Sequence, residues 1–288
     1  MKTALALIAS FATAAALANT PVPGGKWSFT FTDAKGRADR PMRVYTYRPR
    51  KCDSTCPMMF VLHGVKRNAS EYRDYWVALA DHYNILIIAP EFSQKNWPKA
   101  AGYNLGDVGD TKEREKWAFA AVEHLFEEMR DGQQSYVLWG HSAGGQFAHR
   151  FAIFMPGNHA SVIVAANPGW YTMPEWRKDK GAASFPYSLV GSAVGEAELR
   201  EALSHRFVLM LGERDDDPDD ENLNKSDGAM KQGENRVERG ENFFAAATAA
   251  AQALGVAFAW ELVEVPDTVH DADHMATAAA DMLYEKKR

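Results

Sequence analysis

The most constraining feature of the sequence is a glycine–serine turn near the middle of the chain. The apolar run 136–139 leads into Gly140-His141-Ser142-Ala143-Gly144, and residues 146–152 then follow a helical pattern. Strand, G-x-S-x-G and helix in this order predict a sharp turn that holds a serine hydroxyl above the edge of a sheet. The flanking glycines fit because a strained turn leaves no room for a Cβ beside the serine. The serine would then lie at a helix N-terminus, where free N–H groups favour negative charge.

The rest of the chain alternates between strand and helix patterns. Two segments alternate apolar and polar residues and predict an antiparallel hairpin, Lys26–Thr32 and Met42–Tyr47. Further strands are expected at Pro57–Leu62, Ile85–Ala89, Tyr136–Trp139, Ser161–Ala166, Phe207–Leu211 and Val256–Val265. Helices are expected at Ala69–Tyr83, Glu113–Met129, Asn242–Leu254 and Ala272–Glu285, with an irregular stretch at 167–195. Continuously apolar strands between helices predict an α/β fold, with a mainly parallel sheet, helices on both faces and an antiparallel leading hairpin.

The N-terminus predicts export. Met1-Lys2 is followed by an apolar, alanine-rich stretch from Ala4 to Leu17, and Ala16-Leu17-Ala18 gives a small-x-small cleavage site. This order is typical of a signal peptide, here residues 1–18, and predicts a secreted or periplasmic protein. A membrane anchor is the alternative, but about 15 apolar residues are fewer than the roughly 20 that span a bilayer. Residues 19–288 are expected to form one domain.

Charge and cysteine content narrow the function classes. A formal charge of −6 without a basic block argues against nucleic acid as a partner. The two cysteines, Cys52 and Cys56, are close in sequence, and in an exported protein such a pair predicts a disulfide, with two free thiols as the alternative. A metal site would need more ligands at matching spacing, so no metal or other cofactor is expected.

A serine hydroxyl needs a base, and a third group that orients the base, before it acts as a nucleophile. With the elbow at a central strand, the elements above resemble the α/β-hydrolase fold over essentially all of residues 19–288. The resemblance implies the chain order nucleophile, acid, histidine. Ser142 is the expected nucleophile, Asp215 after the strand 207–211 the expected acid, and His270 after the last strand the expected base.

Alternatives to two of these residues remain open. Asp216 and Asp217 are close rivals of Asp215 as the acid, and His274 is a rival of His270. The acidic run 215–221 also fits a solvated loop, or a calcium loop, although Asp220 stands where an EF-hand loop needs glycine. The other histidines, His141, His149, His159 and His205, are interpreted as packing or surface residues.

The oxyanion formed in acyl transfer needs two N–H donors. The resemblance places one on Ala143 and the other in the turn Leu62-His63-Gly64-Val65, where we expect the backbone N–H of Val65, with His63 as a structural hydrogen bonder. The H-G-x turn, the elbow and the export signal resemble the secreted esterase and polyhydroxyalkanoate-depolymerase branch. A full HGGG run, which marks another lipase and esterase branch, is absent.

Substrate contacts are expected from four aromatic residues after strand ends: Trp170, Tyr171, Trp97 and Tyr103. Core packing is an equally good interpretation of each, because aromatic residues are mostly core material. Residues 172–195 are a candidate partial cap. Residues 232–236 and Arg239-Gly240 are interpreted as a polar turn without chemistry.

Together, these patterns and the resemblance predict an exported serine hydrolase that cleaves small or polymeric carboxylic esters through an acyl-enzyme. A secreted peptidase or amidase on the same fold is the alternative, and a non-catalytic binding protein is a further one because fold does not determine function.

Overall fold

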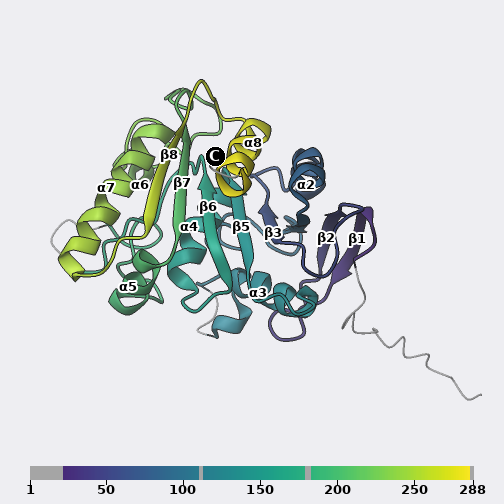
Figure 1. The fold of residues 1–288 in the computed structure, drawn as a ribbon. Coiled ribbons are helices and arrows are strands. Elements are labelled where there is room, and N and C mark those ends of the chain that lie inside the picture. Colours follow the sequence, from purple (N-terminus) through teal and green to yellow (C-terminus); the bar gives the residue numbers. More distant parts are fainter. Residues whose placement is uncertain (1–21, 110–112, 179–182, 286–288) are drawn as a thin grey trace, which may run out of the picture.

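The structure, a computed structural model, describes residues 22–109, 113–178 and 183–285. The expected signal peptide at 1–18 therefore lies outside the described residues. The fold is built on one sheet with strand order β1-β2-β4-β3-β5-β6-β7-β8 (Figure 1). The strands are β1 Gly25–Phe31, β2 Met42–Arg48, β3 Met58–Leu62, β4 Leu86–Glu91, β5 Tyr136–His141, β6 Ala160–Ala166, β7 Phe207–Gly212 and β8 Trp260–Val265.

The sheet has an antiparallel edge and a parallel body, as the sequence predicts. β1 pairs with β2 and β2 with β4 in antiparallel register, whereas all later neighbours are parallel. Every residue of β3, β5 and β7 is buried, because strands covered by helices on both faces have no solvent side. The fold class is thus confirmed.

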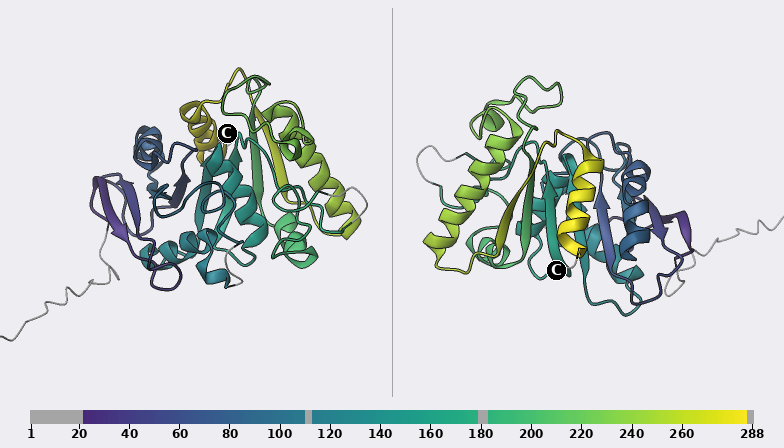
Figure 2. Two further views of the ribbon diagram at one scale, coloured as in Figure 1. Left: turned by 180° about the vertical axis from the view of Figure 1, so that it is seen from behind. Right: turned by 45° about the horizontal axis from the view of Figure 1, so that its top comes forward.

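Helices cover both faces of the sheet (Figure 2), and the sheet divides the hydrophobic core in two. One face packs against α1, α2 and α8, and the other against α3, α4, α5 and α7. The helices are α1 Ala69–Tyr75, α2 Val77–Tyr83, α3 Ala118–Met129, α4 Ala143–Phe154, α5 Glu196–Ser204, α6 Asp227–Met230, α7 Arg236–Leu254 and α8 Ala272–Tyr284, with a 3-10 turn η1 at Arg114–Lys116. No helix within the described ranges combines the length and apolarity that a membrane span requires.

The expected helix at 69–83 is two helices. The chain leaves α1 at Trp76, whose side chain is fully buried and packs edge-on against Trp139, with 5.3 Å between ring centroids. The tertiary contact of one large ring therefore interrupts a segment whose spacing alone favours one continuous helix.

Three further boundaries differ from the sequence prediction. α3 begins at Ala118 because Trp117 is extended, so residues 114–116 form only a 3-10 turn. α7 begins at Arg236, where the Asn235 side chain caps it by accepting from the Glu238 N–H. α5 was not predicted, and β8 begins at Trp260 rather than Val256.

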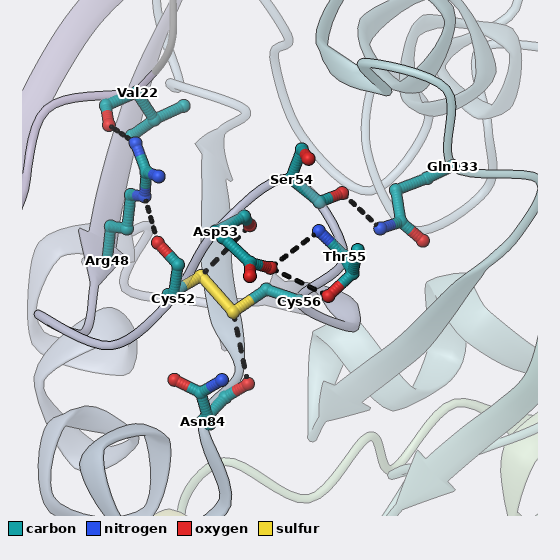
Figure 3. The surroundings of a disulfide bond; sticks show 9 residues. All are labelled: Val22, Arg48, Cys52, Asp53, Ser54, Thr55, Cys56, Asn84 and Gln133. Carbon is teal, nitrogen blue, oxygen red and sulfur yellow. Dashed lines mark hydrogen bonds between the residues drawn. A yellow bond between two sulfur atoms is a disulfide. The ribbon is translucent and has the colours of Figure 1, made fainter.

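Cys52 and Cys56 form a disulfide at the end of the sheet where β3 begins (Figure 3). The loop that it closes is also tied from outside. Arg48 donates to the Cys52 carbonyl at 2.9 Å, and Gln133 donates to the Ser54 carbonyl at 2.6 Å. The pairing predicted from the sequence is thus present, as a local staple between β2 and β3.

We predict that replacing both cysteines by alanine lowers the free energy of unfolding by about 2 kcal/mol, the chain-entropy effect of so short a loop. Urea unfolding measures this loss. A reducing agent should lower the free energy of unfolding of the unmodified protein by a similar amount and should leave that of the double variant unchanged. Equal stability of the two proteins would contradict the prediction.

Three histidines are buried in the core. Burial lowers the pKa of His63 to about 3. Burial also lowers the pKa of His141 and of His149 well below the usual value. The positive charge of Arg236 acts in the same direction on His141, and that of Arg150 does so on His149. In the unfolded chain each would protonate near pH 6.5. The unfolded state therefore binds protons that the folded state excludes, and stability must fall as the pH drops below that value.

We predict that this loss begins below about pH 6.5 and reaches up to about 4 kcal/mol per pH unit when all three histidines contribute. Urea unfolding between pH 7.5 and 5 measures the slope. His149→Gln should reduce the slope by about one third, whereas His82→Gln, at an exposed position, should not change it. Stability that stays constant down to pH 5.5 would rule out this account.

Candidate active site

Four neighbouring strands end at one edge of the sheet, and the loops after them carry the candidate residues. Ser142 follows β5, Asn167 follows β6, Asp215 lies three residues after β7, and His270 lies five residues after β8. Because β5, β6, β7 and β8 are parallel neighbours in this order, their carboxyl ends meet. Residues far apart in sequence are thereby brought together.

Ser142 lies at the tip of the turn between β5 and α4. Its φ of 58° and ψ of −116° are strained values for a residue with a side chain. A Cβ on Gly140 would lie 2.2 Å from the Gly144 carbonyl oxygen, and one on Gly144 would lie 2.2 Å from the Leu62 oxygen. The two glycines are therefore required by the close backbone approach that the sequence pattern predicts.

His270 and Asp215 are joined by a hydrogen bond of 2.6 Å between Nδ1 and Oδ2. Their loops are also joined by backbone bonds, of which one runs from the Arg214 N–H to the Thr268 oxygen at 3.0 Å. The Asp215 side chain is 3% exposed and the His270 side chain 23% exposed. A buried carboxylate therefore orients a partly accessible imidazole.

Arg236, the first residue of α7, holds the other oxygen of Asp215. One of its Nη atoms lies 2.9 Å from Asp215 Oδ1, and the second lies 2.8 Å from Asp220 Oδ1. Burial alone would lower the pKa of Arg236, but the bonds to Asp220 and Asp215 raise it, so this guanidinium stays charged. Both oxygens of Asp215 are thus engaged, which fixes the plane of its carboxylate.

The residues considered as alternatives to Asp215 and His270 do not take part in this hydrogen-bonded pair. Asp216 and Asp217 are exposed. His274 lies inside α8, where its exposed position is one turn beyond the cap residue Asp271. Ser142 Oγ has no hydrogen bond to His270 among the residues that the structure describes. A serine hydroxyl rotates freely, and such catalytic bonds commonly tighten only when substrate binds.

The turn after β3 lies beside the serine. A Cβ on Gly64 would lie 3.8 Å from Ser142 Cβ, so no larger residue separates the turn from the elbow. Val65, which is 56% exposed, and Ala143 line the same cavity as Ser142. Within the described part of the chain, neither backbone N–H of these two residues has a hydrogen-bond acceptor.

The side chains below this turn fix its shape. His63 Nε2 accepts from the Phe92 N–H at 3.1 Å, which gives His63 a structural contact. The Tyr103 hydroxyl donates to the His63 carbonyl at 2.7 Å, and the Arg67 guanidinium stacks 4.4 Å above the Tyr103 ring. The loop 92–103 therefore supports the turn from the core.

His141, next to Ser142, is buried rather than exposed. Its ring centroid lies 4.6 Å from that of His270, and its Nδ1 lies 3.0 Å from the Tyr72 hydroxyl. Its Nε2 has no hydrogen-bond partner among the described residues. The residue before the serine therefore packs directly against the imidazole of His270.

A cavity of about 330 Å³ opens at Ser142. Its walls combine amide, cationic and small side chains, with one aromatic ring, Trp170. The other three aromatic residues expected at the site do not line it. Tyr171 stacks on Phe243 in the core, and Trp97 and Tyr103 pack against Phe92, so these three expectations are corrected.

Two organising residues were missed from the sequence. Arg236 was assigned to a polar turn without chemistry, although it is the residue that holds Asp215. The Asn167 side chain accepts from the Gly212 N–H at 2.8 Å and donates to the Val269 carbonyl at 3.3 Å, so it crosslinks three loops of the site. No local sequence pattern signals either contact.

No protein-family model matches the chain, and no curated protein matches it. Solved structures do. Poly(aspartic acid) hydrolase-1 from Sphingomonas sp. KT-1 is 35% identical, over 92% of this chain and 100% of that protein, with a TM-score of 0.84. LpqC, a poly(3-hydroxybutyrate) depolymerase from Bordetella parapertussis, is 33% identical, over 91% of this chain and 90% of that one, with a TM-score of 0.85.

A more distant structure shares the fold alone. An S-formylglutathione hydrolase from Agrobacterium tumefaciens is 15% identical, over 91% of this chain and 95% of that protein, with a TM-score of 0.59. Identity above 30% over nearly the whole length of the first two proteins, together with the sheet order and the elbow, settles the family. The chain is a member of the α/β-hydrolase superfamily, in its esterase and depolymerase-like branch, and a hydrolase by its relatives.

Proposed function

We propose that this hydrolase is an exported serine esterase that works through Ser142, His270 and Asp215. The observation that carries the proposal is the 2.6 Å bond between Asp215 and His270 at the sheet edge where the elbow serine also lies. The carboxylate accepts from Nδ1 and so leaves Nε2 without a proton, as a base requires.

In the proposed mechanism Ser142 Oγ attacks the ester carbonyl carbon and transfers its proton to His270 Nε2. The carbonyl oxygen becomes an oxyanion, which accepts hydrogen bonds from the backbone N–H groups of Val65 and Ala143. The bond to the leaving oxygen then breaks, and His270 returns the proton to the departing alcohol. Water repeats the sequence on the acyl-enzyme and releases the acid.

A peptidase or amidase activity is the second candidate. One relative is named for poly(3-hydroxybutyrate), whose units are joined by ester bonds, and the other for poly(aspartic acid), whose units are joined by amide bonds. The same triad chemistry serves both bonds. We place the ester first because the elbow, the H-G-x turn and the LpqC relative all support that branch.

Export is part of the proposal. The order of a lysine, an apolar stretch and a small-residue site at 16–18 supports a signal peptide. The disulfide between Cys52 and Cys56 also supports it, because disulfides persist in oxidising compartments.

Residues 172–195 remain a candidate cap, of which 179–182 lie outside the described residues.

We predict that Ser142→Ala lowers kcat for a p-nitrophenyl ester at least about a thousandfold and abolishes labelling by a fluorophosphonate probe. Asp215→Asn should lower kcat about as strongly, whereas Asp216→Asn should not. Matched p-nitrophenyl ester and peptide anilide assays rank the two bond types. Turnover of the anilide alone would reverse our order, and an unlabelled Ser142 in the folded protein would favour a binding protein.

We predict that kcat/KM falls on the acid side with a slope of one in log units. In the proposed mechanism His270 acts as a neutral base, so binding of a single proton to its imidazole removes activity. His141 adds no second proton because burial and the neighbouring positive groups lower its pKa well below the usual value. Initial rates at constant ionic strength test this. A slope of two, or a profile that is flat to pH 4, would contradict it.

A further inference from the structure

The cavity at Ser142 is lined by positive charge. Three cationic side chains, Arg67, Lys99 and Arg236, line it, and within the described residues no carboxylate does. Arg236 is neutralised by Asp215 and Asp220. The other two form no ion pair within the described part of the chain, so no carboxylate of the described residues neutralises their charge.

Arg67 is fixed beside the oxyanion turn. Its guanidinium donates to the carbonyl oxygens of Phe92, Trp97 at 3.1 Å and Lys99 at 2.8 Å, all neutral acceptors. It is 8% exposed, and its Nε has no partner among the described residues. The structure therefore holds a permanent charge at the cavity without a counter-ion.

Lys99 completes this side of the cavity. Its backbone is held, because its N–H donates to Gln94 Oε1 at 3.0 Å and its carbonyl accepts from Arg67. Its side chain is exposed and makes no contact with an acid in the described chain. A flexible ammonium on a fixed anchor beside Ser142 is suited to bind an anionic group.

Behind the wall of the cavity lies one more positive charge that has no carboxylate partner, that of Arg150. Arg150 is fully buried and bonds only to neutral oxygens: Thr172 Oγ1, the Asn104 carbonyl and the Gln146 carbonyl. Asn104 and Gln146 themselves line the cavity. Burial lowers the pKa of Arg150 to about 9, which leaves it charged at neutral pH.

Acidic side chains near the site do not cancel this charge. Asp216, Asp217, Asp219 and Glu221 are exposed, none lines the cavity, and Asp219 is within 3.4 Å of Lys225. They are screened by solvent over about 8 Å at physiological salt, whereas charges in a partly enclosed cavity are screened less. Although the chain carries a net negative charge, positively charged side chains therefore gather around the candidate nucleophile Ser142.

From this arrangement we infer that the cavity takes substrates that carry a free carboxylate close to the bond to be cleaved, with Lys99 and Arg67 as the counter-charge. The inference rests on the proposed function and narrows its substrate class. A neutral polyester or an alkyl ester of the same length would leave the two cations unpaired, and would gain no electrostatic attraction.

The test compares two esters that differ by one methyl group and therefore in charge, mono-p-nitrophenyl adipate and its methyl ester. We expect kcat/KM for the acid to exceed that for the methyl ester by about tenfold at low ionic strength, and the ratio to fall as salt is added. Lys99→Gln should reduce the ratio severalfold and leave only the part that is due to Arg67, and Lys99→Arg should preserve the full ratio. Lys95→Gln, on the same loop but outside the cavity, is the matched control and should leave the ratio unchanged.

A binding experiment keeps this test independent of turnover. In Ser142→Ala protein, calorimetry should show that monomethyl adipate binds about tenfold more tightly than dimethyl adipate, and that Lys99→Gln reduces this difference severalfold. Equal binding of the two, or a Lys99→Gln variant that weakens both alike, would overturn the inference. Preferential binding without turnover of either ester would instead count against the proposed esterase and leave the carboxylate site standing.

Discussion

The site depends on the parallel pairing of β5, β6, β7 and β8. Parallel strands in this order deliver their following loops to one edge, and the Asn167 side chain then ties the loops after β7 and β8 to its own. Gly212 allows the contact, because a Cβ there would lie 2.4 Å from the Thr268 carbonyl oxygen. The separation of Asp215 and His270 is thus set by backbone contacts between the two loops, among them the bond from the Arg214 N–H to the Thr268 oxygen.

Buried arginines connect this edge to the core. Arg67, Arg150 and Arg239 each bond to carbonyl or hydroxyl oxygens rather than to carboxylates. A guanidinium offers several donors in one plane, so one side chain can hold two or three irregular loops that lack their own ladder of hydrogen bonds. The free-energy cost of burying a charge without a carboxylate partner is offset by the dipoles of the carbonyl and hydroxyl groups that accept these hydrogen bonds. Two of the arginines that order the loops, Arg67 and Arg150, also give the cavity its positive charge.

Sequence patterns predicted what local periodicity controls, and failed where distant contacts decide. Apolar runs identified the strands of the sheet, and the resemblance to the α/β-hydrolase fold then indicated Asp215 and His270 in the loops after two of these strands. The break between α1 and α2 at Trp76 could not be predicted from the sequence, because it depends on a contact with the ring of Trp139 in β5. Arg236 and the buried Tyr171 were misjudged for the same reason, since loop residues fold back into contacts that spacing does not encode.

The contact between His141 and His270 makes the charge of the residue before the serine important for the proposed mechanism. With ring centroids 4.6 Å apart, protonation of one imidazole opposes protonation of the other. Burial lowers the pKa of His141 well below the usual value, whereas His270 is partly exposed and hydrogen-bonded to a carboxylate. Under the proposed mechanism the proton from Ser142 therefore goes to His270 alone. A positively charged side chain at position 141 would repel the imidazolium that the reaction forms, so a neutral residue is required beside His270.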